Sequence, residues 1–411
     1  MTEILDVVVI GAGWAGLSVS HGLRAAGVPH VVIERGRIGE TWRTQRWDSF
    51  HFNLPNVLSM LPGDRYEGNE PEGAMTRDEF VALLEDYVAR HGLPIQLGES
   101  VVEVTSDTAN GFVVRTDARQ LMARNVVAAS GSLNRARRPA LSRQIPEDVD
   151  QIDASSYRSA AALEPGAVLV VGSGQSGGQI AKDLADAGRE VFLATSKTGR
   201  LARNYRGRLL AFWLVEAGAL EQRREEFVLP SGAVPARSLQ GALETLSLQG
   251  LSAQGVTLLG RLEGVDGMVL TFGEDAATNV NFADEAAAAL RGRVDDYIAR
   301  EGIAAPPATD DPAEVAAAQL PSPPITSLNL AAYGIRTVIW CTGFDGDFSW
   351  IKVPGALTAD QQPNHVNGIG AGGLYYPGLD FAVTRKSGTI LAAAEEARAM
   401  VAHICERLGR T

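Results

Sequence analysis

A glycine-rich turn near the N-terminus constrains the fold of this 411-residue chain more than any other feature. The turn, Gly11-Ala12-Gly13-Trp14-Ala15-Gly16, follows the apolar run Val7-Val8-Val9-Ile10, which is too short for a helix and rich in β-branched residues. An amphipathic stretch follows at residues 17–26, and a second apolar run ends in Glu34. The order of strand, glycine turn, helix, strand and acid is typical of a dinucleotide-binding βαβ unit.

Each part of this pattern has a physical role at a bound dinucleotide. Gly11 permits the tight turn, Gly13 lets a pyrophosphate approach the backbone, and Gly16 lets the helix pack closely on the strand. The N-terminus of the helix adds free N–H groups and a partial positive charge for the phosphates. Glu34, 23 residues after Gly11, can accept both hydroxyl groups of an adenosine ribose. A GxGxxG motif alone also fits a simple glycine turn, but the flanking strands and the acid favour the dinucleotide site.

A second motif of the same kind begins 161 residues later. Val168-Leu169-Val170-Val171 is a predicted strand, and Gly172-Ser173-Gly174-Gln175-Ser176-Gly177 repeats the glycine turn. The ribose position holds Thr195-Ser196-Lys197 here, with Arg200 shortly after. An acid would repel a 2′-phosphate, whereas hydroxyl groups and cations bind one. The first site therefore suits FAD and the second suits NADPH, unless these cations are simply solvated.

The composition argues against several other functions. The chain carries a formal net charge of −12 and has a sequence pI near 5.1, which argues against binding to nucleic acid or to an anionic membrane. No apolar run reaches the roughly 18 residues of a membrane span, and no basic leader precedes the first strand, so we expect a cytoplasmic protein. The two cysteines, Cys341 and Cys405, make neither a disulfide framework nor a metal site, and we expect no bound metal.

We therefore predict an α/β flavoprotein with two Rossmann-like dinucleotide-binding domains. Residues 1–160 are the expected first part of the FAD-binding domain, and residues 331–411 are its expected C-terminal part. Residues 161–330 are the expected NADPH-binding domain, with a variable substrate-side insertion at residues 205–320. Aromatic residues in the insertion fit either a substrate pocket or the core of a packed helix. Within the first domain, Thr76-Arg77-Asp78-Glu79 has the pattern of a capping box that opens a helix.

The motifs together resemble those of a known enzyme family. Beyond the two glycine turns and Glu34, the most specific stretches are Gly39-Glu40-Thr41-Trp42 and Ile339-Trp340-Cys341-Thr342-Gly343-Phe344. Two strands end in a small residue and a glycine, at Ser130-Gly131 and Thr342-Gly343. Along almost its whole length, the chain is similar to the flavin-containing monooxygenases, a class that includes the plant YUCCA-type enzymes and many bacterial members.

The resemblance implies a mechanism. NADPH reduces FAD, the reduced flavin adds O2 to form a C4a-(hydro)peroxide, and bound NADP+ protects that species from water. One oxygen atom then passes to a small organic substrate, at nitrogen, at sulfur or at a carbonyl carbon. Related enzymes are often homodimers. The competing interpretation is an NAD(P)H-dependent flavin oxidoreductase or oxidase without oxygen transfer. Cys341 and Cys405 lie 64 residues apart, which argues against a disulfide reductase.

The resemblance also assigns a catalytic residue. Family members place an asparagine shortly after a tryptophan-rich loop, close to the flavin and the nicotinamide, and Asn53 matches that position. In the alternative interpretation, Asn53 or Asn56 only satisfies backbone groups of the loop. The loop itself has two interpretations as well, because its aromatic residues, Trp42, Trp47 and Phe50, either pack the loop or line the reactive ring of the cofactor.

One position departs from the family pattern. Asp153 stands where the relatives have a histidine, four residues before Tyr157, and this leaves the type of oxygenation open. The residues predicted to bind the two cofactors are Gly11, Gly13, Trp14, Ala15, Gly16, Glu34, Arg35, Thr41, Trp42, Val102, Ser130, Gly131, Gly172, Ser173, Gly174, Gln175, Ser176, Gly177, Ser196, Lys197, Arg200, Thr342, Gly343 and Ser387.

Overall fold

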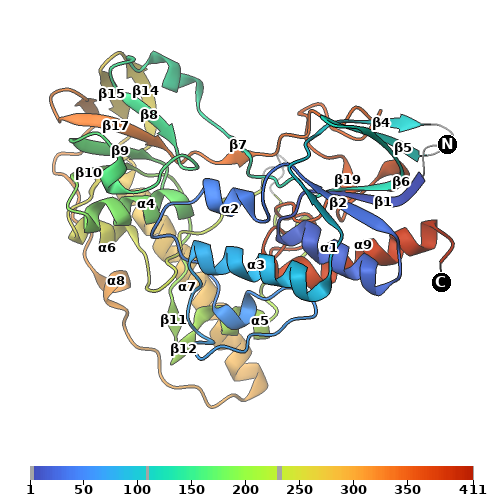
Figure 1. The fold of residues 1–411 in the computed structure, drawn as a ribbon. Coiled ribbons are helices and arrows are strands. Elements are labelled where there is room, and N and C mark those ends of the chain that lie inside the picture. The colour runs from blue at the N-terminus through green and yellow to red at the C-terminus, as the bar shows by residue number, and fades with distance from the viewer. Residues whose placement is uncertain (1–3, 108–110, 229–233, 411) are drawn as a thin grey trace.

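Two lobes, each built on its own parallel sheet, make up the molecule (Figure 1). The computed structural model describes residues 4–107, 111–228 and 234–410. Both chain ends lie on the outer side of the first lobe, away from the second lobe (Figure 1). Within the described ranges, no helix combines the length and the apolar character that crossing a membrane requires.

The first lobe contains a nine-stranded sheet. Its strands are β1 (Ile4–Ile10), β2 (His30–Glu34), β3 (Ile95–Leu97), β4 (Val101–Asp107), β5 (Gly111–Thr116), β6 (Gln120–Ala128), β19 (His365–Val366), β20 (Ile369–Gly370) and β21 (Leu374–Tyr375). Strands β21, β6, β1, β2 and β3 run parallel in that order, and β4 and β5 extend the sheet in antiparallel fashion from β6. Val7 and Val9 face one core while Val8 and Ile10 face another. Burial on both faces explains why this strand is an unbroken apolar run.

Helices cover one face of this sheet. They are α1 (Trp14–Ala25), the short α2 (Glu40–Thr44), α3 (Arg77–His91) and α9 (Ala393–Arg407). The predicted capping box is confirmed at the start of α3, where the Glu79 N–H donates to Thr76 Oγ1 at 3.2 Å and the Thr76 N–H donates to the Glu79 carboxylate at 2.7 Å.

The second lobe repeats the same plan with a five-stranded parallel sheet. Its strands, in spatial order, are β13 (Thr257–Leu259), β10 (Val191–Ala194), β9 (Ala167–Val171), β17 (Ile335–Trp340) and β8 (Asp150–Asp153). On one side lie α4 (Gln175–Asp186) and α6 (Leu248–Ala253). On the other side lies an antiparallel sheet of β14 (Leu262–Asp266), β15 (Val269–Phe272) and β16 (Ser327–Asn329).

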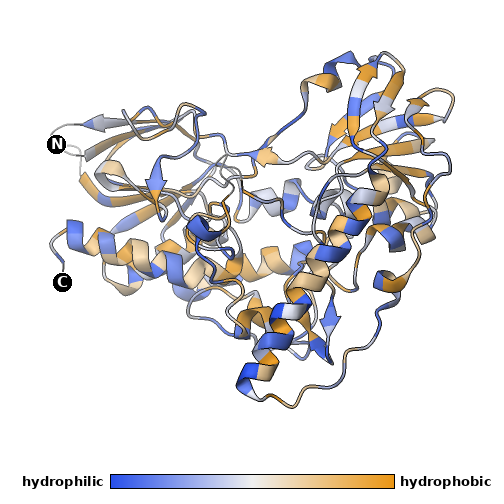
Figure 2. Ribbon diagram, turned by 180° about the vertical axis from the view of Figure 1, so that it is seen from behind, coloured by the Kyte–Doolittle hydropathy of each residue, from blue (hydrophilic) through white to orange (hydrophobic). Residues whose placement is uncertain are grey.

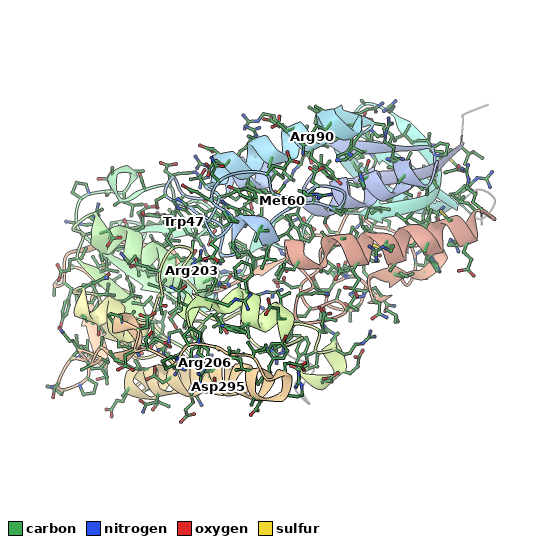
Figure 3. All side chains as sticks on the ribbon, turned by 90° about the horizontal axis from the view of Figure 1, so that it is seen from below. Trp47, Met60, Arg90, Arg203, Arg206 and Asp295 are labelled. Carbon is green, nitrogen blue, oxygen red and sulfur yellow. The ribbon has the colours of Figure 1, made fainter. Side chains whose placement is uncertain are left out.

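Residues 205–320, predicted as an insertion, include α6, β13, β14 and β15, which belong to the layers of the second lobe, and the rest of this range is mainly helical. It holds β11 (Asn204–Tyr205), β12 (Arg208–Leu209), α5 (Leu210–Glu216), α7 (Ala276–Glu301) and α8 (Pro312–Val315). Helix α7 alternates polar and apolar sides along its length (Figure 2), and an ion pair of 2.7 Å between Arg206 and Asp295 ties it to the β11–β12 hairpin (Figure 3). Tyr205 and Trp213 are buried in one core with Val294 of α7, which favours the packing interpretation of these aromatic residues.

Two short strands connect the lobes. Strands β7 (Arg135–Ala136) and β18 (Phe344–Asp345) pair with each other in antiparallel fashion between the two large sheets (Figure 1). Strand β8 precedes the expected boundary at residue 160 and β17 follows the one at residue 330, yet both pair within the second sheet. We therefore propose that the domain boundaries lie at β7 and β18.

Short 3₁₀ helices complete the fold at η1 (Asn56–Leu58), η2 (Ala140–Gln144), η3 (Ala160–Ala162), η4 (Arg224–Glu226), η5 (Ala371–Gly373) and η6 (Ile390–Ala392).

Candidate functional site: two dinucleotide turns and the loop between them

The first glycine turn has the geometry of a phosphate-binding turn. Gly11 has φ +106°, and a Cβ there would lie 2.4 Å from the Ala129 carbonyl oxygen. A Cβ at Gly16 would lie 2.0 Å from the Gly11 carbonyl oxygen. A Cβ at Gly13, by contrast, would meet no atom within 4 Å. Gly11 and Gly16 are therefore required by the protein itself, whereas the bare backbone at Gly13 leaves open space at the start of α1 for a ligand.

Glu34 lies beside this turn at the end of β2. Its carboxylate is buried and accepts two backbone N–H groups, from Ala12 and from Gly36, each at 2.8 Å. The two bonds hold the carboxylate in one orientation. Each of its oxygens has a further lone pair, so the group can still accept the hydroxyl groups of a ribose. The position predicted from the spacing is therefore built as an acceptor site.

The neighbouring strand supplies a buried polar atom that has no hydrogen-bond partner among the described residues. Ser130 follows β6, which pairs with β1, and its Oγ is buried without a hydrogen bond from any residue that the structure describes. Gly131, next in the chain, has φ +84°. Buried hydroxyl groups are nearly always paired. An unpaired hydroxyl group next to the first turn fits a bound cofactor that would satisfy it.

The C-terminal segment closes the same site from another side. A Cβ at Gly378 would lie 2.8 Å from the Ala15 Cβ and 3.3 Å from the Trp14 ring, so this loop packs directly on the first turn of α1. Glu396 lies in the first turn of α9, and burial raises the pKa of its carboxyl group.

Ser387, which we predicted to bind cofactor, shapes this loop. Its Oγ accepts the N–H groups of Val383 and Thr384, both at 3.0 Å, and the side chain is fully buried. The hydroxyl group is therefore turned into its own loop. Its observed role is to hold the segment that packs near Trp14 and Ala15.

The second glycine turn repeats the geometry of the first. Gly172 has φ +107°, and a Cβ there would lie 2.5 Å from the Cys341 carbonyl oxygen. A Cβ at Gly177 would lie 1.7 Å from the Gly172 carbonyl oxygen, while a Cβ at Gly174 would meet nothing within 4 Å. The turn is followed by Gln175 and Ser176 at the start of α4. The open position is again the one at the N-terminus of the helix, as phosphate binding requires.

The ribose end of the second site is ordered by Ser173. Its Oγ accepts the Ser196 N–H at 3.0 Å, which places Ser196 beside the glycine turn. Thr195 is turned inward, because its Oγ1 donates to the Leu259 carbonyl oxygen at 2.7 Å. Lys197 is exposed, three residues after β10 ends, and no ion pair in the described ranges involves it. Its ammonium group is therefore available to a ligand beside the second glycine turn.

The prediction for Arg200 is wrong. Its side chain is only 1% exposed, and its guanidinium forms ion pairs with Asp284 at 2.6 Å and with Glu314 at 2.9 Å. Both acids belong to the insertion, on α7 and α8. The cation is therefore committed to holding these helices and is not presented to a 2′-phosphate.

Four more predicted residues lie outside the glycine turns themselves. Thr342 and Gly343 are at the connection between the lobes, where Thr342 Oγ1 donates to the Arg137 carbonyl oxygen at 2.5 Å and Gly343 has φ +97°. Arg35 is exposed directly after β2, and Val102 is 40% exposed on β4. Thr342 directly follows Cys341, whose carbonyl oxygen lies against Gly172, whereas Arg35 and Val102 form no hydrogen bond with either glycine turn among the described residues.

The tryptophan-rich loop bridges the two lobes. Trp42 follows Thr41 on α2, and its ring packs in the first lobe at 4.8 Å from the Phe52 ring. Trp47 is 5% exposed and belongs to the core of the second lobe, 6.4 Å from the Tyr157 ring. The packing interpretation of the loop is thus observed, and the loop links the two cores.

Polar contacts strengthen the same junction. The Tyr157 hydroxyl group donates to Asp183 of α4 at 2.5 Å, and Ser49 of the loop donates to the other oxygen of that carboxylate. Asp153, which replaces the family histidine, forms an ion pair of 2.7 Å with Arg138. Its carboxylate therefore has a structural partner near the connection of the lobes.

Asn53 lies where the two lobes meet. Its Oδ1 accepts a hydrogen bond of 2.8 Å from Gln179 Nε2, and its backbone oxygen accepts bonds from Gln240 at 3.2 Å and from Arg203 at 3.4 Å. Trp47 and Arg203 both lie in this central region (Figure 3). Asn56, in contrast, is 6% exposed and donates to a carbonyl group of its own loop at 2.9 Å. The backbone-satisfying role therefore falls to Asn56.

Three side chains that hold Asn53 were not among the predicted site residues. Gln179 belongs to the helix after the second glycine turn, so its place on α4 could be inferred from the motif. Gln240 comes from the insertion and Arg203 from the segment just before it, and no recognisable pattern marks either residue. Their contacts with the loop follow only from the docking of the lobes.

The sequence matches a known family over half its length. Residues 8–213 match the sequence profile of the pyridine nucleotide-disulphide oxidoreductases. The chain belongs to this family. Over 405 residues it is 27% identical to an uncharacterized oxidoreductase, CzcO-like, from Geobacillus kaustophilus, with 98% of each chain aligned. Over 200 residues it is 32% identical to indole-3-pyruvate monooxygenase YUCCA1 of Oryza sativa subsp. japonica, which covers 48% of this chain and 49% of that protein.

Solved structures share the fold. A flavin-containing monooxygenase from Stenotrophomonas maltophilia superposes with a TM-score of 0.68 at 18% identity, covering 99% of both chains. A bacillithiol disulfide reductase from Staphylococcus aureus gives 0.62 at 13% identity, covering 98% of this chain and 99% of that one. The enzyme OTEMO in complex with FAD and NADP gives 0.58 at 16% identity, covering all of this chain and 87% of the other.

These findings confirm several predictions at the level of the family. The fold is the predicted two-dinucleotide flavoprotein fold, and the chain is an oxidoreductase. The resemblance to flavin-containing monooxygenases is confirmed, since such enzymes are among both the relatives and the structural neighbours. FAD and NADP(H), the predicted cofactors, are the pair bound in a neighbour of this fold.

Proposed function

We propose that this protein is an FAD-dependent, NADPH-consuming monooxygenase that transfers one oxygen atom from O2 to a small organic substrate. One observation carries the proposal. Two complete glycine turns differ at their ribose ends, with the acid Glu34 at the first and Ser196-Lys197 at the second, and Asn53 lies at the junction of the lobes that hold them. This arrangement suits FAD at the first turn and NADPH at the second.

The residues of the first lobe would bind and orient FAD. The open backbone at Gly13 would receive the pyrophosphate, Glu34 the ribose hydroxyl groups, and Ser130 Oγ a polar group of the cofactor. FAD would supply the oxygen chemistry when bound. In the second lobe, Gly174 and Lys197 would bind the pyrophosphate and the 2′-phosphate of NADPH.

Asn53 is the proposed catalytic residue. Gln179 occupies the oxygen of its side-chain amide, so the N–H2 group is the part that can donate to cofactor or to the oxygenating species. The packed aromatic loop around it, with Trp47 in the second core, would keep water away from that point. The proposal extends to a cytoplasmic location and a homodimer, as in the resembling enzymes; light scattering of the purified protein tests the dimer.

Isotopically labelled O2 tests the reaction directly. The purified protein would be reduced with NADPH, mixed rapidly with labelled O2 in the presence of candidate amines, sulfides and ketones, and followed by flavin absorbance. A flavin species distinct from the oxidised and reduced forms, together with one labelled oxygen in the product, is the expected result. Immediate return to oxidised flavin with all oxygen recovered as hydrogen peroxide would contradict it.

A reductase or oxidase without oxygen transfer is the second candidate, because a disulfide reductase shares the fold. The cysteines of this chain do not favour disulfide chemistry. Cys341 and Cys405 are both free, and burial raises the pKa of the Cys341 thiol well above its usual range, which disfavours the reactive thiolate. Turnover of a quinone or a disulfide with NADPH, without incorporation of label, would identify this alternative.

A further inference from the structure

A short chain of amide groups crosses the junction of the lobes. Gln179 is the fifth residue of α4, the helix that begins at the second glycine turn. Its Nε2 donates to the backbone oxygen of Gln240 at 2.6 Å and to Oδ1 of Asn53 at 2.8 Å. Both hydrogens of that amide nitrogen are therefore used.

This series of hydrogen bonds has a fixed direction because it starts at a backbone carbonyl group. A carbonyl oxygen only accepts hydrogen bonds, so Gln179 must turn its nitrogen, not its oxygen, toward Gln240. The same nitrogen also donates to Asn53, so Asn53 must accept this bond with its side-chain oxygen. The remaining side-chain group of Asn53, its N–H2, is left to point away from Gln179.

We propose that Gln179 is a positioning residue, by which the NADPH-binding lobe orients the N–H2 group of Asn53 toward the flavin and the nicotinamide. This inference rests on the catalytic role proposed for Asn53. A residue of the second lobe would thus act through a residue of the first lobe. The helix that begins at the proposed NADPH site would in this way be coupled to the proposed site of oxygen transfer.

The backbone of Asn53 is held by other groups. Gln240 Nε2 and the Arg203 guanidinium donate to its carbonyl oxygen, and burial lowers the pKa of Arg203, as expected for a cation enclosed at the junction. Loss of the Gln179 side chain should therefore let the side-chain amide of Asn53 rotate, while the backbone of the loop stays held by Gln240 and Arg203.

The docking of the lobes also has independent contacts. Asp183, one turn along α4, binds both Tyr157 and Ser49, and Trp47 is buried in the second core. These contacts remain when the side chain of Gln179 is shortened or made apolar. A Gln179 variant therefore separates orientation of the amide from assembly of the lobes.

A double-mutant cycle on the FAD-loaded protein tests the inference. The dissociation constant of NADP+ is measured by titration, from the change in flavin absorbance, for Asn53→Ala, Gln179→Leu and the double variant. We expect each single change to weaken binding by about tenfold. The double variant should bind as weakly as Asn53→Ala alone, because Gln179 acts only through Asn53. Gln151→Leu is the control, since Gln151 bonds Trp340 away from the junction and should leave NADP+ affinity unchanged.

A charged variant adds a pH signature. The carboxylate of Gln179→Glu can only accept hydrogen bonds, so it would repel the Gln240 oxygen and draw the N–H2 group of Asn53 toward itself. NADP+ affinity should fall at neutral pH and recover as the new carboxyl group takes up a proton at lower pH. A merely structural loss would not recover with pH.

Two results would overturn the inference in distinguishable ways. If Gln179→Leu weakens NADP+ binding further in the Asn53→Ala background, Gln179 acts independently of Asn53. If Asn53→Ala alone leaves NADP+ affinity unchanged, the role of Asn53 falls and the positioning role of Gln179 falls with it. The monooxygenase proposal is tested separately by incorporation of labelled oxygen.

Discussion

The glycines of each turn have different physical duties. A Cβ at Gly16 would lie within 2.0 Å of a backbone oxygen, whereas a Cβ at Gly13 would meet nothing within 4 Å. Gly16 is therefore required for packing of the helix on the strand, whereas Gly13 is required only when a ligand is present. The same contrast holds between Gly177 and Gly174 in the second lobe.

Alanine substitutions should separate these duties. Gly13→Ala should leave the stability of the FAD-free protein nearly unchanged and weaken FAD binding by about tenfold or more, because the methyl group fills the space for the pyrophosphate. Gly16→Ala should lower the free energy of unfolding by about 1–3 kcal/mol or more through overpacking. Urea unfolding and FAD titration of the apoprotein measure the two effects. Equal loss of stability in both variants would contradict the assignment.

Lys197 should determine the preference for NADPH. Gln in its place removes one cation from the 2′-phosphate, so affinity for 2′,5′-ADP should fall about tenfold while affinity for 5′-AMP stays the same. Arg336→Gln is a matched control, because Arg336 is an exposed cation near the start of β17, whereas Lys197 follows the end of β10, a parallel strand of the same sheet. Isothermal titration checks both ligands. A parallel loss for the two nucleotides would show that Lys197 does not contact the phosphate.

Residues whose role is set by local spacing could be predicted from the sequence. Glu34 and the glycines follow from distances along one βαβ unit, and the structure places them together. The role of Arg200 could not be predicted, because its acidic partners Asp284 and Glu314 lie 84 and 114 positions away in the sequence. The charge pattern near the ribose position carries no information about such distant partners.

At the scale of elements, the packing of β2 on α1 contains a pH-sensitive contact. His30 begins β2, and its ring nitrogens lie 2.7 Å from Ser20 Oγ and 2.9 Å from the Val28 carbonyl oxygen. The ring must donate to that carbonyl oxygen and can then accept from Ser20, so the neutral form satisfies both contacts. Burial lowers the pKa of His30.

Acid should therefore destabilise the protein through His30. In the unfolded chain, His30 takes up a proton at about pH 6.5. In the folded protein it takes up that proton only at a lower pH. The stabilising contribution is thus fully present above about pH 6.5 and is lost as the pH falls toward the lowered pKa of the folded state. His30→Gln should reduce the slope of unfolding free energy below about pH 6.5 by at most about 1.4 kcal/mol per pH unit. Urea unfolding across this range measures it, and identical slopes in both proteins would refute the prediction.

Most elements could be predicted from their patterns, but their partners could not. The stretch Thr337-Val338-Ile339-Trp340 was expected as a strand of the FAD-binding part, and it lies in a strand, β17, of the other lobe. A buried parallel strand is apolar on both faces wherever it lies. Its own residues therefore do not specify which sheet it joins.

At the scale of the whole molecule, the two glycine motifs were enough to predict two dinucleotide folds. The connection between them was not predictable, because β7 and β18 are only two residues long and come from distant parts of the chain. The role of the tryptophan-rich loop was also left open by the sequence. Trp47 shows the reason, since it belongs to the first lobe by position and to the second core by packing.

Trp47 should therefore make the two lobes unfold as one unit. Trp47→Ala removes a large side chain that is 5% exposed, at a cost of about 3–5 kcal/mol in unfolding free energy. Because the lost contact joins the lobes, the first lobe should then unfold separately from the second. Visible circular dichroism of bound flavin follows the first lobe, and far-ultraviolet circular dichroism follows the whole chain. The two urea transitions should coincide in the unsubstituted protein and separate in the variant.

Trp350→Ala gives the matched comparison. Trp350 packs against the core of the first lobe alone, so its loss should shift both transitions together toward lower urea without separating them. If the transitions of Trp47→Ala also remain superimposed, the lobes are coupled by the polar contacts of Asp183 and by the β7–β18 pair instead. In that case the aromatic loop serves the cofactor site without holding the lobes together.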